Sequence, residues 1–397
     1  MRVTITLIDP KSIPKDPHGF NRLDAWMLFP FEEVVEFSTK KLAKLAKAAD
    51  PWSSSLAVYY DQDEKLYVHG MIDQAIHYQS YLNYEREDKP PRPGVIQVMI
   101  TGIGILSVML DYHQIAVLNQ DNLVTSYASV LTTGPVAEFL KKGASVSLFS
   151  GYDTLLKELT EEEVTSLHKI NYRYYAQSLC RILLKIKNYA HGGALLITND
   201  FEIRKNSKHK LFYDRIPVAI EHLVLAQADN SALFDDVIKS KRNTKAIPGK
   251  LFDDLDYNYQ DIEDASQELN GAVRFVSSLT CIDGLVLLSP RLEVKGFGTL
   301  IRDIAPPKEI LVYKDVANPS PKSRVSVQSA GHYGTRHQSM IAYCNSYPDS
   351  VGFVVSQDGD IRAIKSVNGK IYVWENIKVH HFLKTSKLPK LLKTRTR

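Results

Sequence analysis

Residues 333–339 read YGTRHQS and place a glycine, a hydroxyl, a guanidinium and an imidazole at four consecutive positions, 334–337. Well upstream, residues 281–288 read CIDGLVLL, in which an Asp-Gly pair enters an apolar run typical of a buried strand. Carboxylates hold divalent cations, whereas hydroxyl, backbone amide and guanidinium groups bind phosphates. We therefore expect the two stretches to line one cleft and to form a metal–nucleotide site.

Each stretch also has a plainer interpretation. Asp283-Gly284 is a common turn, and Thr335 could be a helix N-cap followed by a surface arginine. His332 and His337 could ligate a metal, but no third and fourth ligands follow at a suitable spacing.

The residues around these stretches predict an α/β (α+β) domain with a mixed, largely antiparallel sheet and flanking helices. Asp-Gly at 358–359 and Asn-Gly at 368–369 are strong hairpin turns. Residues 204–210 are expected to form a solvated basic loop, and residues 306–330 a long, proline-containing loop that leads into YGTRHQS. Strands are expected at 284–288, 294–301, 350–356, 361–365 and 370–374, and helices at 221–228 and 262–279.

The N-terminal part predicts a separate α+β domain rich in antiparallel sheet. A helix is expected over 32–48, a hairpin over 55–60 and 66–71, and a strand meander over 95–100, 104–111 and 114–118. Thr160 and Glu163 form a capping box that opens a helix over 161–190. The expected division is an N-terminal domain of unassigned role (1–150), a connecting helix (151–191), a nucleotide-binding domain (192–380) and a basic tail (381–397).

Composition is that of an ordinary globular protein, since 44% of the 397 residues are hydrophobic and 24% are charged. No apolar run approaches the roughly 18 residues that a membrane span needs, and the first residues do not resemble a signal peptide. The three cysteines are scattered and suggest no disulfide framework. These features together predict a cytoplasmic protein.

The positive charge is concentrated in the C-terminal tail. Residues 384–397 carry six lysines and arginines and no acid, and without them the net charge of +4 becomes −2. The tail could make weak contacts with nucleic acid or anionic lipid, or could simply be a solubilising terminus.

Taken in order, five segments resemble the diadenylate cyclase domain, the catalytic domain of the DNA-integrity scanning protein and its membrane-bound relatives. The resemblance covers residues 192–377, and the whole chain resembles the variants described as probable sensor domains, the DACNV-like type. The matching segments are GALLI (193–197), DGL (283–285), VKGFGTL (294–300), GTRHQ (334–338) and VVSQDG (354–359).

This resemblance implies a reaction in which two ATP molecules, held by facing domains of a homo-oligomer, form cyclic di-AMP and release pyrophosphate. It implies a Mg²⁺ or Mn²⁺ ion bound with the nucleotide by Asp283 and Asp358, and catalytic roles for Asp283, Arg336 and His337. The implied nucleotide-binding residues are Gly284, Leu285, Gly334, Thr335, Arg336, Gln338 and Ser356.

The chain departs from the family pattern at three places. Gln338 replaces an arginine, Leu285 replaces an alanine, and Gln357-Asp358 replaces a pair of glutamates. Because charge-assisted hydrogen bonds are about twice as strong as neutral ones, these changes favour a sensor that binds ATP or a cyclic or oligo-adenylate without efficient turnover. The alternatives are an active diadenylate cyclase and a structural or nucleic-acid-binding protein that acts through its tail.

Overall fold

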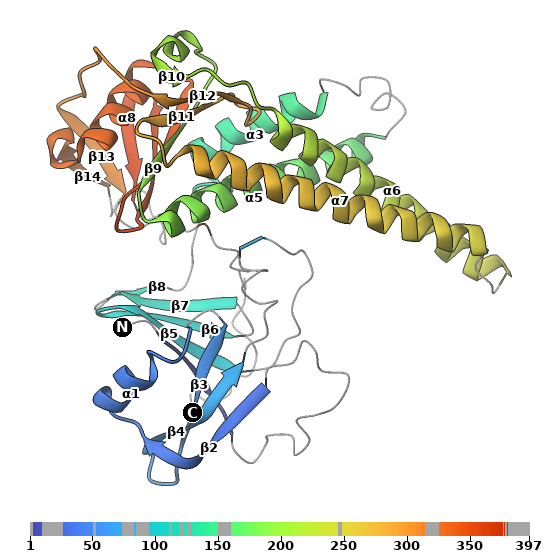
Figure 1. The fold of residues 1–397 in the computed structure, drawn as a ribbon, viewed down its shortest axis with the longest axis vertical. Coiled ribbons are helices and arrows are strands. Elements are labelled where there is room, and N and C mark those ends of the chain that lie inside the picture. The colour runs from blue at the N-terminus through green and yellow to red at the C-terminus, as the bar shows by residue number, and fades with distance from the viewer. Residues whose placement is uncertain are drawn as a thin grey trace. The chain divides into compact units, whose positions relative to one another are not determined.

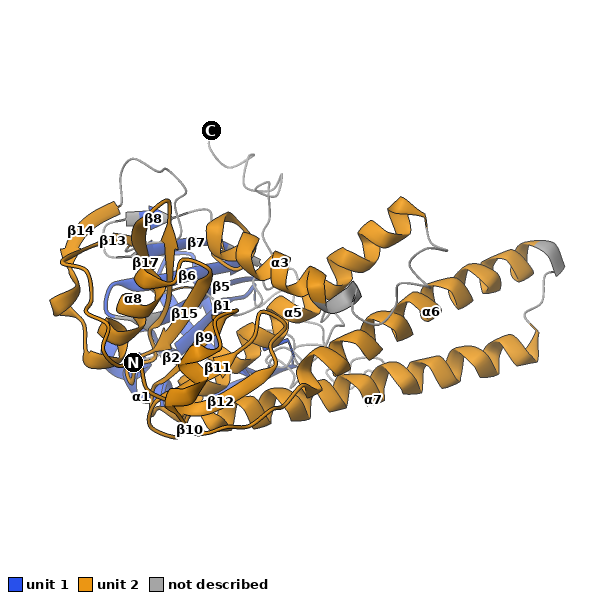
Figure 2. Cartoon of the chain, turned by 90° about the horizontal axis from the view of Figure 1, so that it is seen from above, with its two compact units in different colours: residues 1–127, 380–397 blue, residues 128–379 orange. Residues whose placement is uncertain are grey.

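A computed structural model shows a mixed α/β chain whose contacts divide it into two units, residues 1–127 with 380–397 and residues 128–379 (Figures 1 and 2). The expected division at residue 150 differs from this one. The structure describes residues 3–9, 27–50, 53–73, 83–84, 95–110, 113–119, 122–124, 129–149, 160–244, 248–313, 325–375, 377 and 379. The basic tail, together with its expected nucleic-acid contact, lies outside the described residues.

The first unit is built on an eight-stranded mixed sheet with the order β2-β4-β3-β1-β5-β6-β7-β8. The hairpin and the meander predicted from the sequence are confirmed as β3–β4 and β5–β7. The helix predicted over 32–48 was wrong at its start, because residues 32–36 belong to β2 and the helix begins at Thr39. The elements are β1 (Val3–Leu7), β2 (Met27–Glu36), α1 (Thr39–Leu45), β3 (Ser54–Tyr60), β4 (Leu66–Asp73), β5 (Ile96–Gly102), β6 (Ile105–Leu110), β7 (His113–Asn119) and β8 (Asn122–Val124).

The core of this unit forms where α1 packs on the central strands. Leu42 and Ala46 of α1 are buried against Val3, Leu56 and Val68. All residues of this buried cluster lie within the first 73 positions, apart from the partly buried Ile100 at its border. The first 73 residues therefore carry most of a hydrophobic core of their own.

The second unit contains a nine-stranded mixed sheet with the order β10-β12-β11-β9-β15-β16-β17-β13-β14. Its helices are α3 (Gly134–Phe149), α5 (Glu161–Tyr189), α6 (Arg215–Thr244), α7 (Gly249–Leu279) and α8 (Thr335–Ser346), with short 3-10 turns η1 (Glu202–Asn206) and η2 (Ala330–His332). Its strands are β9 (Gly193–Thr198), β10 (Ser207–His209), β11 (Leu285–Leu288), β12 (Val294–Thr299), β13 (Glu309–Tyr313), β14 (Val325–Ser329), β15 (Ser350–Val355), β16 (Ile361–Val367) and β17 (Lys370–Trp374).

Helices cover both faces of this sheet, as alternate residues of β9 show. A Cβ atom on Gly193 would meet Ile186 of α5 and Thr280 at the end of α7. Ala194, the next residue, belongs to the buried cluster beneath Met340 and Tyr343 of α8. Since successive strand residues point to opposite faces, α8 covers one face and the ends of α5 and α7 cover the other (Figure 1).

The capping box predicted at Thr160 is confirmed, with the side chain of Thr160 accepting from the backbone of Glu163 and the Glu163 carboxylate accepting in return. The sequence left open whether this helix connects two domains or belongs to the second one, and α5 packs with α3, α6 and α7 inside the second unit. Among the described residues, no helix is both long and apolar enough to cross a membrane.

Three other expectations about the second unit need correction. The long loop expected over 306–330 contains β13 and β14, which pair antiparallel and add two strands to the sheet. Residues 204–210 are not a loop, because they include the end of η1 and the edge strand β10, although the lysines of this segment are exposed as expected. Helices α6 and α7 are also longer than expected, at 30 and 31 residues, and they form the long helical hairpin in Figure 2.

Candidate functional site

The strand register brings the two distant polar stretches to one edge of the second sheet. β9 lies between β11 and β15, pairing parallel with the first and antiparallel with the second. Val286 is opposite Leu195, so two residues further back the register aligns Gly284 with Gly193, and Gly193 is itself paired with Val355. Neighbouring strands are about 4.8 Å apart. The entry to β11 and the end of β15 therefore flank the start of β9.

Asp283 is exposed at this edge, immediately before the buried strand β11. Gly284 follows with a φ of +120°, a conformation that side chains other than glycine rarely adopt. A Cβ atom on Gly284 would lie 2.5 Å from the carbonyl carbon of Gly298. The glycine is thus required for close approach to β12, and its contact with a nucleotide stays a prediction.

The second polar stretch, residues 333–339, lies at the start of helix α8. Gly334 is its N-cap residue and makes no side-chain cap, so Thr335 is the first helical residue rather than the cap. The Gly334 carbonyl accepts from the backbone of His337 and Gln338, at 2.9 and 3.1 Å. Helix N-termini present N–H groups that bind anions, and Thr335 is exposed beside them.

Arg336 reaches from this helix turn to the start of β9. A Cβ atom on Gly192 would lie 3.0 Å from Nη1 of Arg336 and 2.9 Å from the carbonyl oxygen of Val355. Gly192 has a φ of +66°. The guanidinium therefore lies over the residue that precedes β9. The Asp283-Gly284 entry belongs to β11, the strand next to β9. The entry to β11 and the Arg336 guanidinium are thus neighbours across the start of β9, and a cleft shared by the Asp283 carboxylate and Arg336 stays a prediction.

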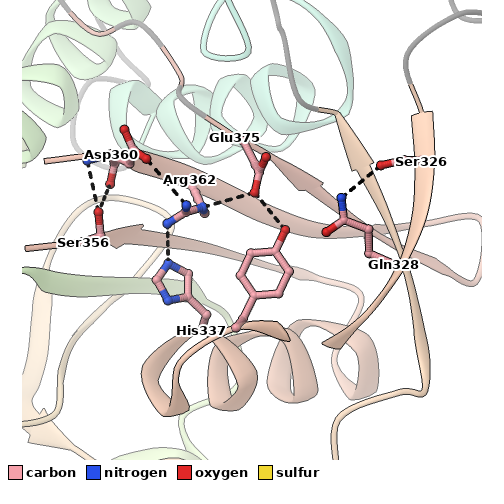
Figure 3. Close-up of polar contacts among 8 residues, drawn as sticks. Ser326, Gln328, His337, Ser356, Asp360, Arg362 and Glu375 are labelled. Carbon is pink, nitrogen blue, oxygen red and sulfur yellow. Dashed lines mark hydrogen bonds and ion pairs between the residues drawn. The ribbon is translucent and has the colours of Figure 1, made fainter. Parts of the chain in front are cut away.

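His337 lies next to a network of charged groups that the sequence analysis did not find (Figure 3). Its Nε2 is 3.1 Å from Nη1 of Arg362 on β16. The Arg362 guanidinium also pairs with Asp360 at 3.6 Å and with Glu375 at 3.5 Å. Glu375 in turn accepts a hydrogen bond of 2.9 Å from the hydroxyl of Tyr333. The network joins the entry of α8 to two neighbouring strands.

The electrostatics of this cluster keep the imidazole neutral. Burial, followed by the positive charges of Arg362 and Arg336, lowers the pKa of His337 to about 4. Burial and the hydrogen bond to Glu375 raise the pKa of Tyr333 above its ordinary value. At neutral pH the cluster thus contains a neutral histidine, a neutral tyrosine, a cationic Arg362 and its carboxylate partners.

The other predicted nucleotide-binding residues occupy several environments. Gln338 donates to the carbonyl oxygen of Tyr333 at 2.5 Å, so its amide is held at the helix entry. Leu285 is 5% exposed and packs in the core cluster beneath α8. Ser356 follows β15, and its hydroxyl accepts from the backbone of Asp360 at 3.1 Å.

The predicted metal ligands Asp283 and Asp358 adjoin different strands, β11 and β15, on either side of β9. Asp358 is exposed in the turn between β15 and β16, while Asp283 precedes β11. Within the described part of the chain, no group of three or more His, Cys, Asp or Glu side chains is placed to hold a metal ion. Asp283 and Asp358 each offer an exposed carboxylate at this end of the sheet, and the backbone of Gln357, next to Asp358, lies beside the Arg336 guanidinium at Gly192.

Two further cations lie near this edge, and the sequence did not predict the position of either. Arg362 is 25 residues from His337 in sequence, and no local pattern connects them. Lys208, placed in the expected basic loop, lies on edge strand β10 with its side-chain carbons 3.2 and 3.3 Å from a Cβ position on Gly298. Its place on an edge strand next to β12 follows only from the sheet order.

Comparison with known proteins gives a family match and likenesses to solved structures. No curated protein matches the sequence. A crystal structure of a double mutant of DacA from Staphylococcus aureus is similar at 12% identity, over 55% of this chain and 91% of that one, with a TM-score of 0.24. At that score the likeness supports no argument. Residues 1–73 match the family described as "Probable sensor domain DACNV", and for this part of the chain the predicted relationship to the sensor-type group is confirmed.

Proposed function

We propose that the second unit binds an adenine nucleotide together with Mg²⁺ or Mn²⁺ at the edge formed by the starts of β9 and β11 and the end of β15, and that the chain is a nucleotide sensor. The observation that carries this proposal is the convergence of the Asp283-Gly284 entry with the Arg336 guanidinium across Gly192. The match of residues 1–73 to a sensor-domain family supports the second part.

The donor set fits a cation that arrives with a nucleotide. Mg²⁺ is commonly held by one or two carboxylates together with substrate phosphates, and Asp283 offers one exposed carboxylate at the edge. The bound cation would neutralise phosphate charge. Arg336 and the N–H groups at the start of α8 would bind the remaining phosphate oxygens, with the Thr335 hydroxyl beside them.

Binding is favoured over turnover because the groups next to Arg336 on α8 add no further net positive charge. Gln338 brings no charge and is held by the Tyr333 carbonyl. His337 is neutral, and the charge of Arg362 is balanced by Asp360 and Glu375. Phosphoryl transfer relies on neutralising developing charge, so a site with these groups is better suited to recognition than to catalysis.

An active diadenylate cyclase is the second candidate, favoured by the exposed Asp283 and Thr335 at an edge that also holds Arg336. It would need two copies that face one another, since each contributes one ATP.

Calorimetry of the full chain with mono-, di- and cyclic nucleotides, with and without Mn²⁺, separates these functions when product mass spectrometry accompanies it. Metal-dependent binding of an adenine nucleotide without product supports the sensor. Rapid formation of cyclic di-AMP and pyrophosphate supports the cyclase instead. No binding of any adenine nucleotide overturns both.

A further inference from the structure

The contact between Arg362 and His337 restricts the chemistry of the imidazole. Nη1 of Arg362 is 3.1 Å from Nε2 of His337, within hydrogen-bond distance. A guanidinium has only N–H donors and stays protonated in proteins. A hydrogen bond at this distance therefore requires Nε2 to be the acceptor and to carry no proton.

Arg362 is itself held in place from three directions. Asp360 lies 3.6 Å from Nη2, and Glu375 lies 3.5 Å from Nε. The Tyr333 ring lies beneath the guanidinium, with 5.7 Å from its centroid to Cζ. The arginine side chain is only 18% exposed. These contacts come from the residue before β16, the residue after β17 and the entry of α8, and Figure 3 shows Asp360, Glu375 and His337 around Arg362.

Arg336 is the other charged group near the imidazole, and it comes from the same helix turn. A second proton on His337 would put a cation close to Arg362 and under the influence of Arg336, and would turn an N–H toward Nη1 of Arg362. Both effects disfavour the doubly protonated ring.

We infer that Arg362 is a positioning residue that fixes His337 as a neutral imidazole protonated on Nδ1, so that His337 acts toward an anionic ligand only as a single N–H donor. Glu375 and Tyr333 support this arrangement, because Glu375 forms an ion pair with Arg362 and accepts a hydrogen bond from the Tyr333 hydroxyl. The assignment refines the proposed nucleotide site and excludes His337 as a general acid or as a cationic phosphate ligand at neutral pH.

This inference rests on the proposed function only for the identity of the ligand, and its test needs none. Full-length protein with ¹⁵N-labelled histidine is measured at pH 7 by long-range ¹H–¹⁵N spectroscopy, and His337→Gln identifies the resonance. The expected result is a protonated Nδ1 and an unprotonated Nε2. A proton on Nε2, or on both nitrogens, overturns the inference even if nucleotide binds.

Substitutions of Arg362 extend the same test. Arg362→Met should return His337 to the Nε2-protonated form, and Arg362→Lys, which keeps a donor, should preserve the Nδ1 form. Arg242→Met on the exposed end of α6 is the matched control and should change nothing. An unchanged tautomer in folded Arg362→Met contradicts the inference. If that variant does not fold, the wild-type and Arg362→Lys spectra still decide.

Nucleotide affinity gives an independent readout. In Arg362→Met the affinity for Mn²⁺–ATP should fall about fivefold, as expected when one oriented hydrogen bond is lost, with partial recovery in Arg362→Lys. Wild-type protein that has the Nδ1 tautomer but binds no nucleotide contradicts the proposed function and leaves the inference standing. Equal affinities for wild type and Arg362→Met, with the tautomer altered, would show that His337 does not contact the ligand.

Discussion

The guanidinium of Arg336 lies directly over Gly192, with Nη1 3.0 Å from the position that a Cβ atom of residue 192 would occupy. This relationship places a residue of α8 at the start of β9. The parallel partner of β9 is β11, which begins just after Asp283-Gly284. The site proposed above depends on this placement, and so do the following expectations.

Replacing Gly192 by alanine should destabilise the second unit and displace Arg336. The φ of +66° alone costs an L-residue about 1–2 kcal/mol, and the new Cβ would lie 2.9 Å from the Val355 carbonyl oxygen. Urea unfolding should show a lower free energy of unfolding for this variant than for the wild type. Gly271→Ala is the matched control, because a Cβ there meets no atom within 4 Å and the helix interior should gain about 0.5–1 kcal/mol. Equal stabilities for the two variants would contradict the packing described here.

The pH dependence of stability should report the neutral state of His337. Its folded pKa, about 4, lies below the ordinary value of 6.5. The unfolded chain therefore binds a proton more readily, and stability is lost as the pH falls from about 6.5 toward 4. This pH-dependent part of the free energy of unfolding should be absent in His337→Gln. For a partly exposed ring it should amount to about 2 kcal/mol or less.

Urea unfolding at several pH values between 4 and 7 measures this component. The exposed His332→Gln is the matched substitution, since it removes a histidine just before the same helix. Parallel pH profiles for wild type and His337→Gln would show that the imidazole is not held neutral.

Thiol labelling should single out the cysteine near the proposed site. Cys281 is exposed, whereas Cys180 and Cys344 are buried, and burial raises the pKa of Cys344 to about 12. Native protein should therefore react quickly at one thiol with Ellman's reagent, and Cys281→Ser should remove that phase. Because Cys281 is two residues from Asp283, Mn²⁺–ATP should slow the reaction. Labelling that nucleotide leaves unchanged would place the ligand elsewhere.

Local patterns in the sequence predicted much of the fold. The capping box at Thr160 and the start of α5 coincide, and the Asp-Gly and Asn-Gly turns lie between the strands that they were expected to join. Errors arose where local signals were weak. Residues 32–36 carry apolar and acidic side chains that suit either a helix or a strand, and pairing with β4 decides for the strand. β13 was hidden because it is short and follows two prolines.

The site was harder to predict from the sequence than the fold was. A resemblance in motif order suggested that Asp283 and Arg336 share a cleft, but only the register of β11, β9 and β15 shows how they reach the same edge. The pairing of His337 with Arg362 depends on the packing of α8 over β16, which involves residues far apart in sequence. Long-range pairings of this kind leave no periodic signal in the chain.

The most direct test of the central claim is a double-mutant cycle on the affinity for Mn²⁺–ATP, measured by calorimetry for wild type, Asp283→Asn, Arg336→Met and the double variant. Asp253→Asn, an exposed carboxylate change on α7, serves as the control. We expect a loss of about tenfold or more for each single variant, with a coupling between them that differs from simple addition. Wild-type affinity in both single variants, or no metal-dependent binding by the wild type, would contradict it.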